Sequence, residues 1–254
     1  MGATGEFDVL PTIGSKELVA LLPFLLQTKR ILIPEIAYPT YRVGGILAGA
    51  EVLEVGVDAG DWPVSDIDLA WINSPSNPTG RVHSVDELRS VIEYSRTHNS
   101  IVASDECYLN FAAKGKAQPV SLLKVAEGNN KNLLSVYSLS KRSNLAGYRA
   151  GLIVGDPDLI ARIREIRKHA GMLVPAPVQR AMAVALGDEV HVQEQSARYA
   201  NRREVLRPAL EKAGFTVEYS DAVLYIWCTR KEQDWESITW LSDRGILATP
   251  GHFY

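Results

Sequence analysis

Three short polar segments carry the side chains that could do chemistry, and each follows an apolar run of strand length. The first covers residues 73–80 and reads Asn-Ser-Pro-Ser-Asn-Pro-Thr-Gly. The second begins with Asp105, and the third contains Lys141, eight positions before Arg149. In open α/β sheets ligands bind beyond the carboxyl ends of the strands, so we expect these segments to meet at one edge of a sheet. That edge would gather an amide, a carboxylate, an amine and a guanidinium.

Each segment also has a purely structural interpretation. Asn-Pro-Thr-Gly is a good turn sequence by itself, and a serine or aspartate at the end of a strand often caps the next helix. An isolated lysine or arginine is usually solvated or paired with a carboxylate. The functional interpretation is favoured because three such groups occur in order at three successive strand ends.

The combination of groups matches the needs of pyridoxal phosphate. This cofactor requires a lysine amine for a Schiff base, an acidic partner for its pyridinium nitrogen and donors to its ring oxygen. Its phosphate needs hydroxyls, an arginine and a helix N-terminus, which Gly14, Ser15 and Lys16 would supply. The sequence lacks the motifs of a P-loop, of a nicotinamide site and of a serine-hydrolase nucleophile elbow. We therefore expect a pyridoxal-phosphate site.

The hydrophobic pattern predicts the elements that would position these groups. Apolar runs alternate with stretches of helical period, which predicts a mostly parallel sheet sandwiched by helices. Ser84 and Glu87 form a capping box at the start of a helix that continues to Thr97. Other helices are expected at 15–27 and 41–48, and strands at 30–33, 51–57, 69–72, 100–104, 133–137 and 150–154.

After residue 156 the pattern changes. Helices are expected at 159–169, 177–186, 190–213 and 235–243, antiparallel strands at 215–219 and 223–229, and a short strand at 246. We interpret residues 1–170 as a large α/β domain that binds pyridoxal phosphate. Residues 171–254 are interpreted as part of a smaller C-terminal α+β domain.

Composition and charge restrict the class of protein. The 254 residues include 27 Lys and Arg against 30 Asp and Glu, which gives no reason to expect a nucleic acid or an acidic membrane as partner. The apolar stretch 18–26 is interrupted by Pro23 and is too short to span a bilayer. Cys107 and Cys228 are the only cysteines, which argues against a disulfide framework or a zinc site. We expect a metal-free cytoplasmic protein.

The motifs in this order resemble the class I/II aminotransferases of the fold-type I pyridoxal-phosphate enzymes. The resemblance covers nearly the whole chain and rests on residues 13–17, 34–41, 73–80, 104–108 and 138–149. Within the family, residues 74–81, 138–151 and 168–179 look most like the actinobacterial succinyldiaminopimelate aminotransferases. The resemblance implies transfer of an amino group from an amino acid such as glutamate to a keto acid, with N-succinyl-2-amino-6-ketopimelate of lysine biosynthesis as the candidate.

The resemblance also implies a role for each candidate residue. Lys141 would bind the cofactor as a Schiff base and then move a proton between the substrate α-carbon and the cofactor. Asp105 would keep the pyridine nitrogen protonated. Asn77 and Tyr108 would hydrogen-bond the ring oxygen, and Tyr38 would stack on the ring face or simply pack in the core. The phosphate-binding residues would be Gly14, Ser15, Lys16, Ser138, Arg149 and, more weakly, Ser140.

The chain departs from the family pattern at both ends. Family members are longer by roughly a hundred residues or more. Thirteen residues precede Gly14, where the family has an N-terminal arm, and the sequence stops at Tyr254, before the family's arginine for the substrate α-carboxylate. Arg230 and Arg244 do not match that motif. We therefore expect an aminotransferase truncated at both ends, with a complete cofactor cradle and an incomplete substrate pocket.

Two other functions stay open. A pyridoxal-phosphate-dependent β-lyase or decarboxylase would use the same cradle, because those residues serve the ring and not the substrate. A non-catalytic cofactor-binding fragment is the third candidate, although the presence of both Lys141 and Asp105 argues against it. A regulator would need a DNA-binding segment, and no basic helix-turn-helix pattern is visible. The resemblance further implies a homodimer with amino-acid and keto-acid substrates and no nucleic-acid or membrane partner.

Overall fold

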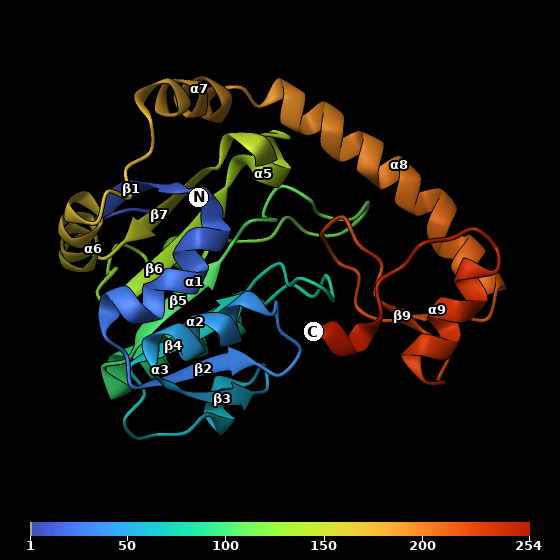
Figure 1. Ribbon diagram of the computed structural model, residues 1–254, viewed down its shortest axis with the longest axis horizontal. Helices are drawn as coiled ribbons and strands as arrows, with labels where there is room; N and C mark the ends of the chain where they lie inside the picture. The colour runs from blue at the N-terminus through green and yellow to red at the C-terminus, as the bar shows by residue number, and fades with distance from the viewer. Residues whose placement is uncertain (1) are drawn as a thin grey trace.

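One seven-stranded sheet with helices on both faces forms the centre of the molecule (Figure 1). The structure is a computed structural model that describes residues 2–254. The strand order is β1-β7-β6-β5-β4-β2-β3, and β2 to β6 run parallel, whereas β7 is antiparallel to both of its neighbours. The strands are β1 (Asp8–Ile13), β2 (Arg30–Pro34), β3 (Glu51–Val55), β4 (Leu69–Asn73), β5 (Ile101–Asp105), β6 (Leu133–Ser138) and β7 (Ala150–Gly155). The prediction of a mostly parallel sheet sandwiched by helices is therefore confirmed.

Helices cover the two faces of the sheet because its central strands are apolar on both sides. In β4, Leu69 and Trp71 belong to the core on one face, and Ala70 and Ile72 to the core on the other. The first core lies under α1 (Gly14–Leu26), α2 (Thr40–Ala48) and α6 (Pro157–His169). The second lies under α3 (Val85–His98), α4 (Leu122–Val125) and α7 (Ala176–Gly187).

Most predicted elements are confirmed to within a few residues, and the capping box of Ser84 and Glu87 is formed at the start of α3. Strand β1 was not predicted, because Pro11 lacks a backbone N–H and argues against a strand. It is tolerated because β1 lies at the edge of the sheet, where Pro11 is opposite Leu152.

The C-terminal part begins with the long helix α8 (Val190–Lys212), which leads away from α7 along the top of the view in Figure 1. It continues with β8 (Thr216–Val217), β9 (Cys228–Thr229) and α9 (Asp234–Ser242). Strands β8 and β9 are antiparallel, as predicted, but each has two residues. The predicted strand at residue 246 is wrong, because the N–H of Ile246 bonds to the carbonyl of Leu241 and closes the turn after α9.

Two short helices complete the part of the chain that matters for the site. Helix α5 (Leu139–Arg142) follows β6 directly, and the 3-10 turn η2 (Ala146–Tyr148) precedes β7. Within residues 2–254 no helix is long and apolar enough to cross a membrane.

Candidate active site

A cavity of about 230 Å³ lies at the carboxyl ends of β4, β5 and β6. Parallel pairing brings these ends together, since Asn73 of β4 pairs with Asp105 of β5. The end of β1 reaches the same edge, because Thr12 and Ser138 both pair with Gly151 of β7. Every candidate residue except Gly14 lines this cavity: Ser15, Lys16, Tyr38, Asn77, Asp105, Tyr108, Ser138, Ser140, Lys141 and Arg149.

Asp105 lines the cavity and is buried, with 7% of its surface exposed. Its Oδ1 accepts a hydrogen bond from the N–H of Cys107 at 3.2 Å, and its Oδ2 accepts one from the hydroxyl of Tyr41 at 3.1 Å. Burial raises the pKa of Asp105, while the hydrogen bonds from Cys107 and Tyr41 act in the opposite direction. A buried carboxylate of this kind is stabilised by a cationic N–H partner, such as a pyridinium nitrogen.

Two asparagines hold the loop after β4 against Asp105. The side-chain N–H of Asn73 donates to the carbonyl of Asp105 at 2.9 Å, and its Oδ1 accepts from the N–H of Asn77 at 2.7 Å. Within residues 2–254 the buried Oδ1 of Asn77 has no hydrogen-bond partner. This amide oxygen can only accept, so a ligand oxygen would be bound by the Nδ2 N–H group of the same side chain.

Tyr108 lines the middle of the cavity with 5% of its surface exposed. Its hydroxyl lies 2.8 Å from the hydroxyl of Tyr225. Burial is the main cause that raises the pKa of Tyr108 far above its ordinary value. The phenol therefore keeps its proton at every physiological pH and can donate it to an oxygen in the cavity.

The part of the cavity at the start of α1 is suited to an anion. Helix α1 begins there, and in the described part of the chain its N-terminus has no side-chain cap, so its first N–H groups point outward. Gly14 has a φ of +70°, and a Cβ at this position would lie 2.3 Å from Nη2 of Arg149. The guanidinium of Arg149 therefore packs directly against the first turn of α1. Helix dipole, guanidinium and the hydroxyls of Ser15 and Ser138 together form a cradle for phosphate.

Lys141 lines the same cavity and lies on the single turn α5. Its neighbours fix this turn: Leu139 is fully buried, and Arg142 is 2% exposed. Nη1 of Arg142 donates to the carbonyl of Ala185, and Nη2 pairs with Glu189. These anchors hold the backbone of α5 in place. The Lys141 side chain lines the cavity from this fixed turn.

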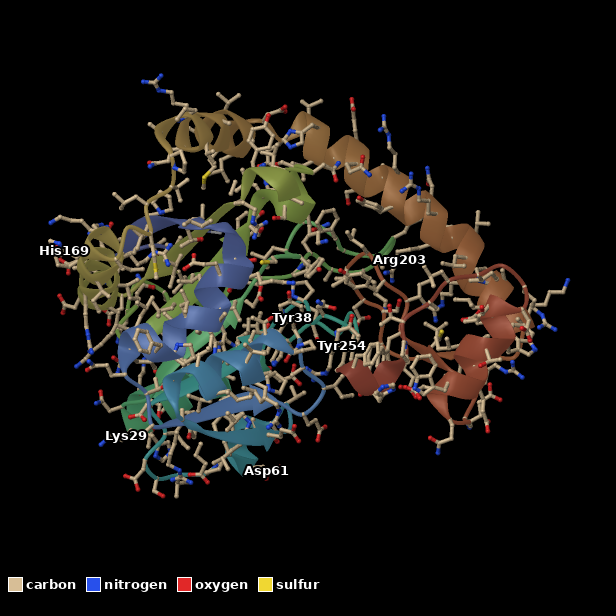
Figure 2. The ribbon with its side chains drawn as sticks, viewed as in Figure 1. Lys29, Tyr38, Asp61, His169, Arg203 and Tyr254 are labelled. Atoms are coloured by element: carbon tan, nitrogen blue, oxygen red, sulfur yellow. The ribbon has the colours of Figure 1, made fainter. Side chains whose placement is uncertain are left out.

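Tyr38 lies near the middle of the molecule, in contrast to Lys29 and Asp61 at the periphery (Figure 2). Nζ of Lys16 lies 5.6 Å from the centroid of its ring, and the ring of Tyr41 meets it edge-on at 6.0 Å. The ring is therefore positioned at the cavity wall. It can lie against a flat ligand.

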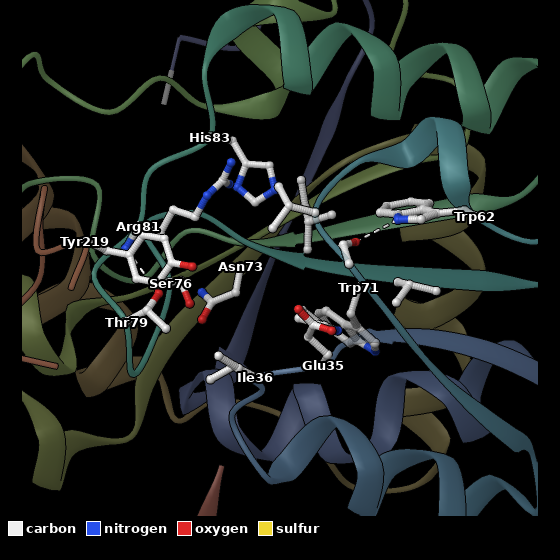
Figure 3. A pocket seen from close by; sticks show the side chains of 15 residues that line it. Glu35, Ile36, Trp62, Trp71, Asn73, Ser76, Thr79, Arg81, His83 and Tyr219 are labelled. Carbon is white, nitrogen blue, oxygen red and sulfur yellow. Dashed lines mark hydrogen bonds between the residues drawn. The ribbon is translucent and has the colours of Figure 1, made fainter. Parts of the chain in front are cut away.

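A smaller cavity of about 70 Å³ adjoins the first, and Asn73 lines both. Figure 3 shows Arg81 and His83 on one side of it and Glu35 and Trp71 on the other. Burial lowers the pKa of His83 to about 4, so this imidazole is neutral at pH 7. No lysine lines this cavity, and among residues 2–254 no cluster of His, Cys, Asp and Glu side chains could hold a metal ion.

Sequence reasoning missed four residues of the site: Tyr41, Asn73, Cys107 and Tyr225. Three of them lie inside segments that had been singled out, so the position of Tyr41 near Tyr38, of Asn73 near Asn77 and of Cys107 near Asp105 was the available signal. Tyr225 had no such signal, because it is 117 positions from Tyr108 and lies in an irregular segment.

The sheet, with a lysine, an aspartate and an anion cradle at one edge, defines the fold-type I class of pyridoxal-phosphate proteins. The family model for aminotransferase class I and II matches residues 4–254, and the chain belongs to this family. The family uses pyridoxal phosphate, and the buried carboxylate, the unpaired Asn77 amide and the cradle at Gly14 fit that cofactor.

Individual proteins support this assignment. The chain is 53% identical to a probable aminotransferase, Rv1178, of Mycobacterium tuberculosis, over 98% of this chain and 60% of that protein. It is 50% identical to the 4-dedimethylamino-4-oxo-anhydrotetracycline transaminase OxyQ of Streptomyces rimosus, over 97% of this chain and 69% of that one. A probable N-succinyldiaminopimelate aminotransferase from Thermus thermophilus matches with a TM-score of 0.89 at 26% identity, over 97% of this chain and 70% of that chain. The chain thus spans between 60% and 70% of the length of these proteins.

Proposed function

We propose that this chain carries the cofactor-binding part of a pyridoxal-phosphate-dependent aminotransferase, which moves an amino group from glutamate to a keto acid. The observation that carries the proposal is the convergence of Lys141, Asp105 and the Arg149 cradle on one cavity. An anion site, an amine and a buried carboxylate in one cavity match the phosphate, the aldehyde and the ring nitrogen of the cofactor.

When bound, pyridoxal phosphate supplies an electron-withdrawing ring and a carbon that carries the amino group between the two substrates. Asp105 pairs with the protonated ring nitrogen. Tyr108 donates its proton to the ring oxygen, and Asn77 completes the hydrogen bonds there. The phosphate is held by the N-terminus of α1 and by Ser15, Lys16, Ser138, Ser140 and Arg149, and Tyr38 lies against the ring.

Lys141 has two tasks. Its Nζ would hold the cofactor covalently. As a free amine it would move a proton between the substrate α-carbon and the cofactor. The rigid turn α5 keeps the amine within reach during both steps.

The acceptor is the finer part of the proposal, and we propose N-succinyl-2-amino-6-ketopimelate. The name of the Thermus thermophilus relative supports this substrate at 26% identity, whereas the OxyQ relative at 50% identity is named for a tetracycline ketone. These substrates differ in whether a carboxylate adjoins the reacting carbonyl. Which of the two acceptors receives the amino group therefore distinguishes a keto-acid aminotransferase from a transaminase that acts on a ketone.

The experiment measures 2-oxoglutarate formed from glutamate, with each acceptor in turn, in the presence of pyridoxal phosphate. Formation of 2-oxoglutarate that requires Lys141 and an acceptor supports the aminotransferase. Release of pyruvate and ammonia from a sulfur amino acid without an acceptor would instead assign a β-lyase, and release of carbon dioxide a decarboxylase. Cofactor binding without any of these products would leave a cofactor-binding fragment.

The proposal includes the organisation of the protein. Residues 1–170 would form the cofactor-binding domain and residues 171–254 part of a smaller one. Limited proteolysis is expected to cut first in the irregular segment between α6 and α7. A homodimer in the cytoplasm is also proposed, and sedimentation of the purified chain and fractionation of cells test these two statements.

A further inference from the structure

The hydroxyls of Tyr108 and Tyr225 form a pair inside the cofactor cavity. They lie 2.8 Å apart, and the two rings meet edge-on with centroids 5.8 Å apart. The two residues come from distant parts of the chain, because Tyr108 follows β5 and Tyr225 lies between β8 and β9. The pair is therefore a direct contact between the C-terminal segment and the side chain proposed to bind the cofactor's ring oxygen.

Arg203 fixes the segment that carries Tyr225. Its guanidinium extends from α8 and donates to the carbonyls of Ser220, Ala222, Val223 and Tyr225 at 2.7 to 3.2 Å (Figure 2). These four carbonyls lie in the irregular segment between β8 and β9, which have two residues each. Because the planar guanidinium of Arg203 binds four carbonyls at once, it holds the backbone of Tyr225 in a defined place.

The distance between the two phenol oxygens allows either one to be the donor, and their burial favours one direction. Tyr108 is 5% exposed, so its oxygen finds partners only inside the cavity, whereas Tyr225 is 37% exposed and its oxygen can also accept from water. Each phenol has one proton. If Tyr108 donated to Tyr225, it would have no proton left for an anionic ligand oxygen.

We propose that Tyr225 is a positioning residue for the cofactor's ring oxygen: it donates to the oxygen of Tyr108 and so commits the proton of Tyr108 to the ring. This inference rests on the proposed function. Donation by Tyr225 also polarises the Tyr108 hydroxyl and strengthens its own donation, because successive hydrogen bonds reinforce each other. The C-terminal segment thereby acts on the cofactor's ring oxygen through Tyr108.

The test is a pH titration of the visible absorption of the chain loaded with pyridoxal phosphate. A ring oxygen that is less stabilised as an anion makes the nitrogen bound at Lys141 hold its proton more tightly. Tyr225→Phe is therefore expected to move the midpoint upward by about half a pH unit, the value of one neutral hydrogen bond. Tyr108→Phe should move it further, and adding Tyr225→Phe to Tyr108→Phe should change nothing more, because the effect passes through Tyr108.

Two further variants separate this role from a structural one. Tyr219→Phe changes an exposed tyrosine of the same segment and should leave the midpoint in place. Arg203→Lys replaces the fork by a single ammonium and should shift the midpoint in the same direction as Tyr225→Phe. An unchanged midpoint in Tyr225→Phe, or an additive shift in the double variant, overturns the inference alone. Absence of the visible band in the unsubstituted chain overturns the proposed function and the inference together.

Discussion

The hydroxyl of Tyr41 donates a hydrogen bond to Oδ2 of Asp105 at 3.1 Å, although the two residues lie 64 positions apart. Tyr41 is fully buried, and its ring stacks on Trp71 with centroids 5.1 Å apart. Burial raises the pKa of Tyr41 well above its ordinary value, so its hydroxyl can only act as a protonated group beside the carboxylate. The aromatic stack of the sheet core thus sets the position of a donor to Asp105, which lines the cofactor cavity.

Tyr41→Phe keeps the stack and removes the donor. Because this donor favours the ionised carboxyl, its loss raises the pKa of Asp105. The acid limb of the pH profile of cofactor affinity should then move upward by about one pH unit, as expected for a hydrogen bond to a charged group. The measurement is the dissociation constant of pyridoxal phosphate as a function of pH. Superimposable profiles would refute this role.

A second buried tyrosine provides the control for Tyr41→Phe. The hydroxyl of Tyr94 donates to the carbonyl of Pro63, remote from the cofactor cavity. Each of the two substitutions removes one hydrogen bond of a buried phenol, so Tyr94→Phe should lower the free energy of unfolding by about as much as Tyr41→Phe. The pH profile of cofactor affinity should stay unchanged in Tyr94→Phe.

Gly14→Ala tests the cradle. A Cβ at residue 14 would lie 2.3 Å from Nη2 of Arg149, so the guanidinium has to leave the first turn of α1. Loss of this charged donor is expected to weaken cofactor binding about tenfold or more. Isothermal titration with pyridoxal phosphate gives the affinity.

Gly49→Ala separates the clash from backbone strain. Gly49 has a φ of +68°, nearly that of Gly14, and within residues 2–254 its Cβ would meet nothing within 4 Å. Both variants carry the cost of a left-handed alanine, about 1–2 kcal/mol. Equal cofactor affinities in the two variants would contradict the packing of Arg149 against Gly14.

The buried carboxyl of Glu106 is expected to make the stability of the protein depend on pH. It is fully buried beside Asp105, its Oε1 accepts from Leu122 and Ser135, and burial raises its pKa from 4.5 to about 7. Between these values the folded carboxyl holds a proton that the unfolded chain releases. The free energy of unfolding therefore falls as the pH rises through this window, and the loss is complete above about pH 7.

Glu106→Gln removes this titration. Above about pH 7 the variant should be more stable than the unsubstituted chain by about 3 kcal/mol, and below about pH 4.5 the difference should vanish. Urea unfolding at a series of pH values measures it. A difference that grows as the pH falls would have the wrong sign and would exclude a raised pKa.

The sequence was sufficient to predict that the residues following the strand ends meet in one site, and the reason is geometric. Parallel pairing aligns the carboxyl ends of β4, β5 and β6, so Asn77, Asp105 and Lys141 meet once the strands are recognised. Helix α3 was equally predictable, because its capping box is a local interaction.

Other features depend on long-range packing and leave no local pattern. Strand β1 contains Pro11 and is stabilised by its partner β7 and not by its own propensity. The segment around Tyr225 is held by Arg203 on α8, which donates to the carbonyl of Tyr225, whereas the apolar pattern predicts a strand there. The contact between Tyr225 and Tyr108 joins residues 117 positions apart, so the sequence alone could not reveal it.

The most direct test of the account is the visible absorption of the purified chain with pyridoxal phosphate, compared with Lys141→Ala and Lys168→Ala. Lys168 is an exposed lysine that pairs with Glu165 on α6 and serves as the matched control. We predict a visible band that Lys168→Ala retains, that Lys141→Ala abolishes, and that bleaches when glutamate is added. A band that persists in Lys141→Ala, or no band in the unsubstituted chain, would contradict the assignment of this cavity.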